Sequence, residues 1–229
     1  DYRSSRGLGD VYKRQVNLHI DCMRQLGAEI DIVDGYIKAK AKDGLKGGNI
    51  NFSNVTVTGT ENAIMAGVLA KGTTTISNAA KEPEVVDLVA CLRKMGAKIF
   101  GEGTDRIEIN GVNALEPCDY SVMADRIEIG TYLTAVTMTK GNVSIKCSLP
   151  SVLETILDKL KIAGANIQID EEGINLEMDK IPNPVNISTA PFPLFPTDMQ
   201  AQFIALNSIS KGKSKVIENV FENRFMHVQ

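Results

Sequence analysis

The sequence repeats itself with a period of about seventy residues. The pentapeptides "LGAEI", "MGAKI" and "AGANI" place glycines at positions 27, 96 and 164, which are 69 and 68 residues apart. A second series, "KGTTTISN", "KGNVSIKC" and "KGKSKVIEN", places glycines at 72, 141 and 212, which are 69 and 71 residues apart. Self-similarity at a fixed period is typical of folds built from copies of one supersecondary unit. Two independent series with the same period therefore indicate a repeat architecture.

Each of these glycines follows a segment that is typical of a helix and precedes a run rich in Thr, Val and Ile. Glycine often ends a helix because it adopts the left-handed conformation without strain, so we predict six helix ends. Helical spacing produces two apolar faces; their residues are Val85, Leu88, Val89, Leu92 and Met95, then Val152, Leu153, Ile156, Leu157 and Leu160. Two short strands follow, with turns at 101–105 and 170–173.

The predicted unit is strand, helix, strand, helix, strand, strand. One copy extends from about residue 54 to 112 and another from about 120 to 178. The chain is expected to open in the second half of an earlier copy and to close in the first half of a later one. A unit of this size buries little surface alone, so copies must pack against one another. The predicted fold class is α/β, built from repeated βαβαββ units.

Composition and charge exclude two classes of partner. Twenty-five basic and 28 acidic residues give a net charge of −3, and no Lys or Arg cluster is present, so we expect no nucleic-acid partner. The apolar runs are too short to cross a bilayer, so we expect no membrane partner. No signal peptide is recognisable, and we expect a cytoplasmic location. Residues 1–15 are polar and lack periodicity, and we expect them to be a non-native segment.

The cysteines lie far apart and lack the C-x-x-C spacing of zinc sites and redox motifs. They are Cys22, Cys91, Cys118 and Cys147. The spacing predicts neither a zinc site nor a redox pair, and it fits a reducing compartment.

The stretch "PFPLFPTDMQAQF" surrounds Asp198 with unusual rigidity. Thr197-x-x-Gln200 predicts a capping box at the start of a helix, and Asp198 then lies in the first turn, where the helix dipole favours a negative charge. Three prolines precede Asp198 and restrain the backbone of the loop. A cap alone does not require such restraint, which favours a carboxylate held in place for chemistry.

Several strings together resemble a known family. They are "AAKEPEVVDL", "GTDRIEING", "ADRIEIGTYL", "FPTDMQAQF" and "VFENRFMH". They are similar to the UDP-N-acetylglucosamine 1-carboxyvinyltransferases, which are enolpyruvyl transferases, over residues 16–228. The resemblance implies two inside-out, barrel-like α/β domains of βαβαββ units, with substrates bound in the cleft between them. For this chain it implies an internal fragment with two incomplete domains, 16–122 and 123–229.

The reaction implied by the resemblance transfers the enolpyruvyl group of phosphoenolpyruvate to the 3-hydroxyl of UDP-N-acetylglucosamine and releases phosphate. Such an addition and elimination needs a base for the hydroxyl, an acid for the methylene carbon and cations for the anionic groups. The resemblance implies neither a metal ion nor an organic cofactor. The family's reactive-cysteine loop and late arginines have no counterpart in this sequence, so we expect no phosphate release from this chain alone.

The resemblance implies three catalytic residues. Asp198 matches the aspartate that takes the proton from the sugar hydroxyl, with helix capping as the alternative. Glu82 matches a glutamate that lines the cleft, but an acid beside a proline at a helix start is equally common. Asp125 lies near the expected domain crossover and forms a capping-box-like pair with Glu128, so a purely structural role is its alternative.

The resemblance also implies substrate contacts in three segments. They are Arg14, Gln15, Val16, Asn17 and Leu18; Asn54, Thr56, Val57 and Thr58; and Val220. Gln15 and Asn17 stand where the family has proline and aspartate, and Asn54 stands where it often has lysine. The match of Val220 concerns its main chain, and the alternative is an ordinary buried valine.

The remaining polar candidates have structural alternatives. His19 and His227 lack a cysteine or an acid at ligand spacing, which favours structural roles. Arg224 is placed either to contact a substrate anion or to pair with a nearby carboxylate. Two other functions stay open, a sister transferase that acts on shikimate 3-phosphate and a non-catalytic repeat scaffold.

Overall fold

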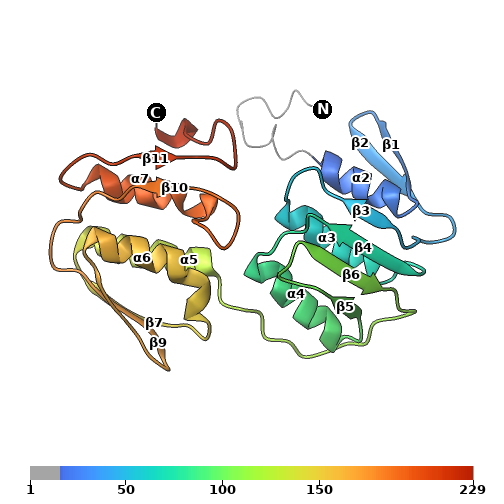
Figure 1. Ribbon diagram of the computed structural model, residues 1–229, viewed down its shortest axis with the longest axis horizontal. Helices are drawn as coiled ribbons and strands as arrows, with labels where there is room; N and C mark the ends of the chain where they lie inside the picture. Colours follow the sequence, from blue (N-terminus) through green and yellow to red (C-terminus); the bar gives the residue numbers. More distant parts are fainter. Residues whose placement is uncertain (1–15, 229) are drawn as a thin grey trace. The chain divides into compact units, whose positions relative to one another are not determined.

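The computed structural model describes residues 16–228, and the chain divides between Ser121 and Val122 into two compact units. Unit 1 precedes this boundary and unit 2 follows it. Helices and strands alternate along both units, so the chain has a mixed α/β fold (Figure 1). Within the described residues, no helix combines the length and the apolar character needed to cross a membrane.

Unit 1 opens with a helix and an antiparallel hairpin and continues with one whole copy of the predicted unit. The hairpin group is α2 (Asn17–Gln25), β1 (Glu29–Val33) and β2 (Tyr36–Lys40). The whole copy is β3 (Asn49–Asn51), α3 (Val57–Gly67), β4 (Thr73–Ser77), α4 (Pro83–Lys94), β5 (Lys98–Phe100) and β6 (Arg106–Asn110). The βαβαββ order is therefore confirmed here, although its first strand begins earlier than predicted.

The sheet of unit 1 has the order β3-β4-β6-β5, in which β3 and β4 are parallel and the other pairs are antiparallel. The predicted apolar face of α4 packs against the core, because Val85 and Val89 are fully buried. Ile76, Ile107 and Ile109 of the sheet join the same core. Burying each such side chain stabilises the unit by about 1.5–3 kcal/mol.

Unit 2 contains one incomplete copy and the first half of another. The first group is α5 (Arg126–Thr139), β7 (Asn142–Lys146), a 3-10 turn η1 (Pro150–Leu153), α6 (Glu154–Ala163), β8 (Asn166–Ile169) and β9 (Gly173–Glu177). The second is β10 (Ile187–Ser188), the 3-10 turn η2 (Thr197–Met199), α7 (Gln200–Ser208), β11 (Val216–Ile217) and the 3-10 turn η3 (Met226–Val228). β7-β9-β8 form an antiparallel sheet, and β10 pairs with β11 in parallel.

The predicted first strand of the second copy, near residue 120, is wrong. Within the described residues, no strand lies between β6 and α5. The segment before α5 instead contacts α4, because the Glu116 N–H donates to the Met95 carbonyl and the Tyr120 hydroxyl donates to Asp87. The first bond satisfies a main-chain donor without a sheet partner, and the second ties the segment to α4 through a side chain.

The core of unit 2 joins helix faces to the β7-β9-β8 sheet. The predicted apolar face of α6 is confirmed by the burial of Ile156, Leu157 and Leu160. Phe203 of α7 is also fully buried, and its ring meets that of Phe195 edge to face at 5.0 Å. This edge-to-face contact helps to fix the loop before η2 against α7.

The first glycine series ends helices as predicted. Gly27 and Gly96 follow α2 and α4 with φ of 90° and 97°, and Gly164 caps α6 with φ of 106°. These values lie in the left-handed region that glycine occupies without strain. The three equivalent helices therefore stop by the same device.

The second glycine series marks a helix end only at Gly141, which follows the last residue of α5 by two positions, and the prediction is wrong for Gly72 and Gly212. Gly72 and Gly212 have positive φ, but α3 already ends at Gly67 and α7 at Ser208. At the end of α5 the left-handed residue is Lys140, with φ of 58°, one position before the repeat glycine.

The barrel-like shape implied by the resemblance is not observed. The described residues form four separate open sheets, none of which closes on itself. The repeats are thus present as local topology.

Candidate functional site

Asp198 lies in the 3-10 turn η2 that leads into α7. Its side chain is 58% exposed, and its Oδ1 accepts a hydrogen bond of 2.7 Å from Nη2 of Arg224. The Arg224 guanidinium lies 5.1 Å from the centre of the Phe221 ring, which supports its orientation. Of the two alternatives for Arg224, pairing with a carboxylate is the one observed.

The capping box predicted at Thr197 and Gln200 is wrong, since neither η2 nor α7 has a side-chain cap. Thr197 Oγ1 and Gln200 Nε2 both donate to Oε2 of Glu218, at 2.8 and 3.2 Å. The other oxygen, Oε1, accepts from the main-chain N–H groups of Val220 and Phe221, at 2.9 and 3.0 Å. In a capping box both side chains would accept from main-chain N–H groups, but here they donate, and the ionised Glu218 is a strong acceptor for both.

Hydrogen bonds hold Glu218 in its ionised form. Partial burial alone would raise the pKa of Glu218, but bonds from the Phe221 and Val220 N–H groups and from Thr197 and Thr189 outweigh it and lower the pKa. The sequence did not point to Glu218, because it lies twenty positions beyond Asp198, in the repeat string "KGKSKVIEN", which indicated only a structural marker.

Glu218 brings together Asp198 and Val220, which were separate candidates in the sequence. Its Oε2 accepts from Thr197 and Gln200, which flank Asp198 in the sequence, and its Oε1 accepts from the main-chain N–H of Val220. Val220 is 37% exposed, so the alternative of a buried valine is wrong. We call this group the Glu218 cluster; its members are Thr197, Asp198, Gln200, Glu218, Val220, Phe221 and Arg224.

In unit 1, His19 joins the two other predicted substrate segments. Its Nδ1 lies 3.1 Å from Asn62 Nδ2, and its Nε2 lies 3.5 Å from Thr58 Oγ1. Thr56 caps α3, because its Oγ1 accepts from the N–H of Gly59 at 3.2 Å. The starts of α2 and α3 are therefore side by side, and His19 has a structural role.

The other predicted substrate residues of unit 1 fall into three groups. The exposed ones are Val16, Asn17 and Asn54. Those that pack against the core are Leu18 and Val57. Arg14 and Gln15 lie outside the described residues.

Glu82 is buried, with 7% exposure, at the N-cap of α4, directly before a proline at the first helical position. Its side chain does not cap the helix. Glu61 of α3 lies near this carboxylate. Partial burial and the charges of Glu84 and Glu82 raise the pKa of Glu61. These carboxylates form an acidic group at the start of α4.

Asp125 caps α5, as the structural alternative predicted. Its Oδ1 accepts from the N–H groups of Ile127 and Glu128, at 2.8 and 3.0 Å. The next residue, Arg126, is buried and lies 5.7 Å from the centre of the Phe192 ring. A cleft role for Asp125 stays a prediction.

A shallow pocket of about 340 Å³ lies on the β7-β9-β8 sheet. Polar side chains such as Asn142, Asn166 and Asn175 line it, and none of the predicted site residues does. Glu177 also lines it, but no residue of the predicted site lies with this carboxylate, so we do not assign the pocket a role in catalysis. Among the described residues, no group of three or more His, Cys, Asp or Glu is placed to hold a metal ion.

The sequence profile of one family, described as EPSP synthase (3-phosphoshikimate 1-carboxyvinyltransferase), matches residues 7–229. The fold is similar to that of the enolpyruvyl transferase NikO from Streptomyces tendae, with 22% identity and a TM-score of 0.81. That alignment covers 93% of this chain and 53% of NikO. EPSP synthase from Acinetobacter baumannii is also similar, with 19% identity, a TM-score of 0.63, and 91% and 49% of the two chains covered. The chain thus spans about half the length of these structures.

Proposed function

Because the chain belongs to the EPSP synthase family of carboxyvinyltransferases, we propose that it serves the transfer of an enolpyruvyl group from phosphoenolpyruvate to an acceptor hydroxyl, with release of phosphate. We further propose that the acceptor is the 3-hydroxyl of UDP-N-acetylglucosamine. The strings around Asp198 and Val220 support this acceptor, because they carry the resemblance to that branch. The reaction would then be the first committed step of peptidoglycan synthesis, in the cytoplasm, by a protein with barrel-like domains.

The observation that supports the proposal most directly is the Glu218 cluster. It holds an exposed carboxylate, Asp198, beside a guanidinium and fixes it relative to the main chain of Val220. A general base must be held within hydrogen-bonding reach of the hydroxyl it deprotonates. In the proposed mechanism Asp198 is this base, and Val220 contacts the nucleotide through its main chain.

Arg224 has two tasks in this mechanism. Its hydrogen bond to Oδ1 orients the Asp198 carboxylate, while Oδ2 is the oxygen we assign to the sugar hydroxyl. Its positive charge also lies where phosphate and carboxylate groups of the substrates need compensation.

Unit 1 contributes a second group of residues to the proposal. The contacts of His19 with Thr58 and Asn62 keep the starts of α2 and α3 together, so that two segments can contact one nucleotide. Glu82 is buried at the N-cap of α4, and its main chain is held by the start of that helix, so in the proposal its carboxyl group has a fixed position beside the substrates. Asp125 has a smaller part in the proposal, because its Oδ1 is engaged in capping α5.

The acceptor is tested by titrating the ¹⁵N-labelled chain with UDP-N-acetylglucosamine and recording amide chemical shifts. We expect weak, saturable binding, with shifts at Val220, Phe221 and the turn that contains Asp198. Shikimate 3-phosphate at the same concentration is expected to leave these amides unchanged. Shifts with shikimate 3-phosphate alone would establish the sister transferase, which the match to the EPSP synthase family favours.

Matched variants show whether binding involves the cluster. Asp198→Asn keeps the shape of the side chain, and we expect several-fold weaker binding because a charge-assisted bond to the ligand is lost. Asp158→Asn, an exposed position on α6, is the control and is expected to bind normally. Absence of any nucleotide-sugar or shikimate 3-phosphate response would favour the repeat scaffold.

A further inference from the structure

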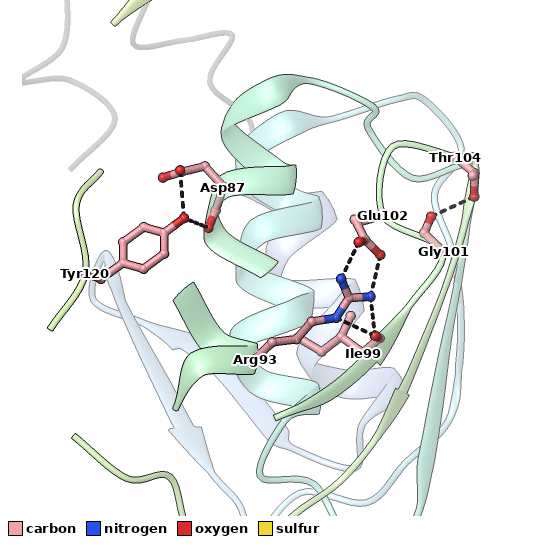
Figure 2. Close-up of polar contacts among 7 residues, drawn as sticks. All are labelled: Asp87, Arg93, Ile99, Gly101, Glu102, Thr104 and Tyr120. Carbon is pink, nitrogen blue, oxygen red and sulfur yellow. Dashed lines mark hydrogen bonds and ion pairs between the residues drawn. The ribbon is translucent and has the colours of Figure 1, made fainter. Parts of the chain in front are cut away.

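The last segment of unit 1, residues 112–121, lies along helix α4; we call it the connecting segment. The Glu116 N–H donates to the Met95 carbonyl at 2.9 Å, just beyond the C-terminal end of the helix. The Tyr120 hydroxyl donates to Oδ1 of Asp87 at 2.8 Å and to its carbonyl at 3.1 Å, near the N-terminal end (Figure 2). The segment therefore runs antiparallel to the helix, with a contact at each end.

Two cysteines lie between these contacts. Cys91 is four residues from both Asp87 and Met95, so all three lie on the same face of α4. Cys118 lies midway between Glu116 and Tyr120, and Cys91 lies midway between Met95 and Asp87, so the two contacts place Cys118 opposite Cys91. The fold thus brings together two thiols whose separation of 27 residues in the sequence predicted no pairing.

The surroundings distinguish these two thiols from the others. Cys91 and Cys118 are half-buried, whereas Cys22 and Cys147 are buried in the cores of the two units, so a small solute reaches only the first pair readily. Partial burial, then Cys118 and Asp87, raise the pKa of Cys91, and Lys94 opposes them. Cys91 therefore keeps its proton more firmly than an ordinary thiol.

We propose that Cys91 and Cys118 form an oxidisable dithiol, which hydroperoxides convert into an intrachain disulfide between helix α4 and the connecting segment. The contacts on both sides of the pair hold the two segments together, so the opposed thiols can approach to disulfide distance without moving either segment away from the other. The disulfide fastens to α4 the segment through which the chain continues into unit 2.

The reaction proceeds in two balanced steps. The Cys118 thiolate attacks one oxygen of the hydroperoxide; an S–O bond forms, the O–O bond breaks, and an alcohol or water leaves after protonation. The sulfur of Cys91 then attacks the sulfenic acid of Cys118; the S–S bond forms, the S–O bond breaks, and the Cys91 proton leaves with hydroxide as water. The two thiols lose two electrons, which the hydroperoxide takes up.

The experiment treats the reduced chain with excess hydrogen peroxide, blocks the remaining thiols, and maps peptides by mass spectrometry without reduction. We expect Cys91 linked to Cys118 as the dominant product, and Cys22 and Cys147 recovered as blocked thiols. The linked form is expected to exchange the amide hydrogens of residues 112–121 at least about tenfold more slowly, since a disulfide restricts local opening. Pairing with other cysteines, or oxidation of both residues without a link, overturns the proposal.

Variants separate the two roles. Cys91→Ser is expected to leave a sulfenic acid on Cys118 that dimedone traps, whereas Cys118→Ser is expected to leave Cys91 largely unlabelled. Cys147→Ala is the control and is expected to form the link at the normal rate. Equal labelling of Cys91 and Cys118 in the two single variants contradicts the assigned order of attack; if a variant does not fold, the peptide map of the unaltered chain still decides whether the pair forms.

Discussion

Two partly buried glutamates show how differently the two units treat a negative charge. Glu218 in unit 2 receives donors from two side chains and two main-chain N–H groups, and its pKa falls although burial opposes ionisation. Glu61 in unit 1 is also partly buried, but it faces the charges of Glu84 and Glu82, and its pKa rises.

The comparison shows that burial alone does not decide whether these carboxylates ionise. Burial raises the pKa in both cases, and the neighbouring groups decide the net direction. Glu218 is an anchor that joins the Asp198 turn to the Val220 segment. Glu61 belongs to a group of acids in which one more negative charge destabilises the fold.

The largest expected effect comes from Glu218→Ala. Several donors lose their acceptor, and we expect unit 2 to lose about 3 kcal/mol of stability, because bonds to charged groups contribute about 1.5–3 kcal/mol each and are not additive. Hydrogen exchange followed by mass spectrometry should show roughly 100-fold faster exchange in α7 and in residues 216–221, with unit 1 unchanged.

The control for this substitution is Glu171→Ala, an exposed carboxylate in the turn between β8 and β9. It is expected to leave exchange in α7 unchanged. If Glu218→Ala altered exchange no more than this control, the proposed contrast between Glu218 as an anchor and Glu61 as an unanchored acid would be wrong.

A second prediction concerns an anchor inside unit 1, the guanidinium of Arg93. Its Nε and Nη2 donate to the Ile99 carbonyl at 2.9 and 2.6 Å, and it pairs with Glu102, whose pKa is lowered (Figure 2). Arg93→Met keeps much of the apolar stem but removes these bonds between α4 and the β5-β6 hairpin. We expect a loss of about 2 kcal/mol, measured as roughly 30-fold faster exchange in β5.

Arg106→Met, an exposed arginine of the same hairpin, is the matched control and is expected to change exchange less than about threefold. Comparable effects of the two substitutions would show that Arg93 contributes only general charge. The anchored carboxylates would then not form one class across the two units.

The sequence predicted those parts of the fold that local chemistry determines. Helical spacing identified the buried faces of α4 and α6, and the glycines at 27, 96 and 164 identified helix ends, because only a left-handed residue is needed there. Lys140 shows the limit of this rule. At the end of α5 a lysine takes the left-handed conformation in place of the glycine that follows it, so the repeat glycine lies at the helix end without supplying the turn.

The arrangement of the candidate site was less predictable, because it depends on partners distant in the sequence. The pattern Thr197-x-x-Gln200 predicted a local cap, but Glu218 competes for both side chains from beyond α7. Likewise, Cys91 and Cys118 lie opposite each other only because the connecting segment binds α4 and does not form a strand. Such choices are made by tertiary contacts, and a short motif does not contain them.

The smallest expected effect, Glu61→Gln, tests the other side of the comparison. Because the folded state raises the pKa of Glu61, its ionisation opposes folding: stability is greatest below the ordinary pKa of about 4.3 and falls as the pH rises through the folded-state value. The pH dependence that Glu218 contributes has the opposite sign: its stabilising contribution is present above pH about 4.3 and is lost as the pH falls through its lowered pKa.

Glu61→Gln removes the charge facing Glu82 and Glu84, so at pH 7 exchange in α3 should slow about two- to threefold, and the dependence on pH between 4 and 7 should flatten. Glu108→Gln, an exposed position on β6, should change neither quantity. A slower exchange at pH 7 that persists unchanged at pH 4 would trace the gain to packing and not to repulsion among the acids.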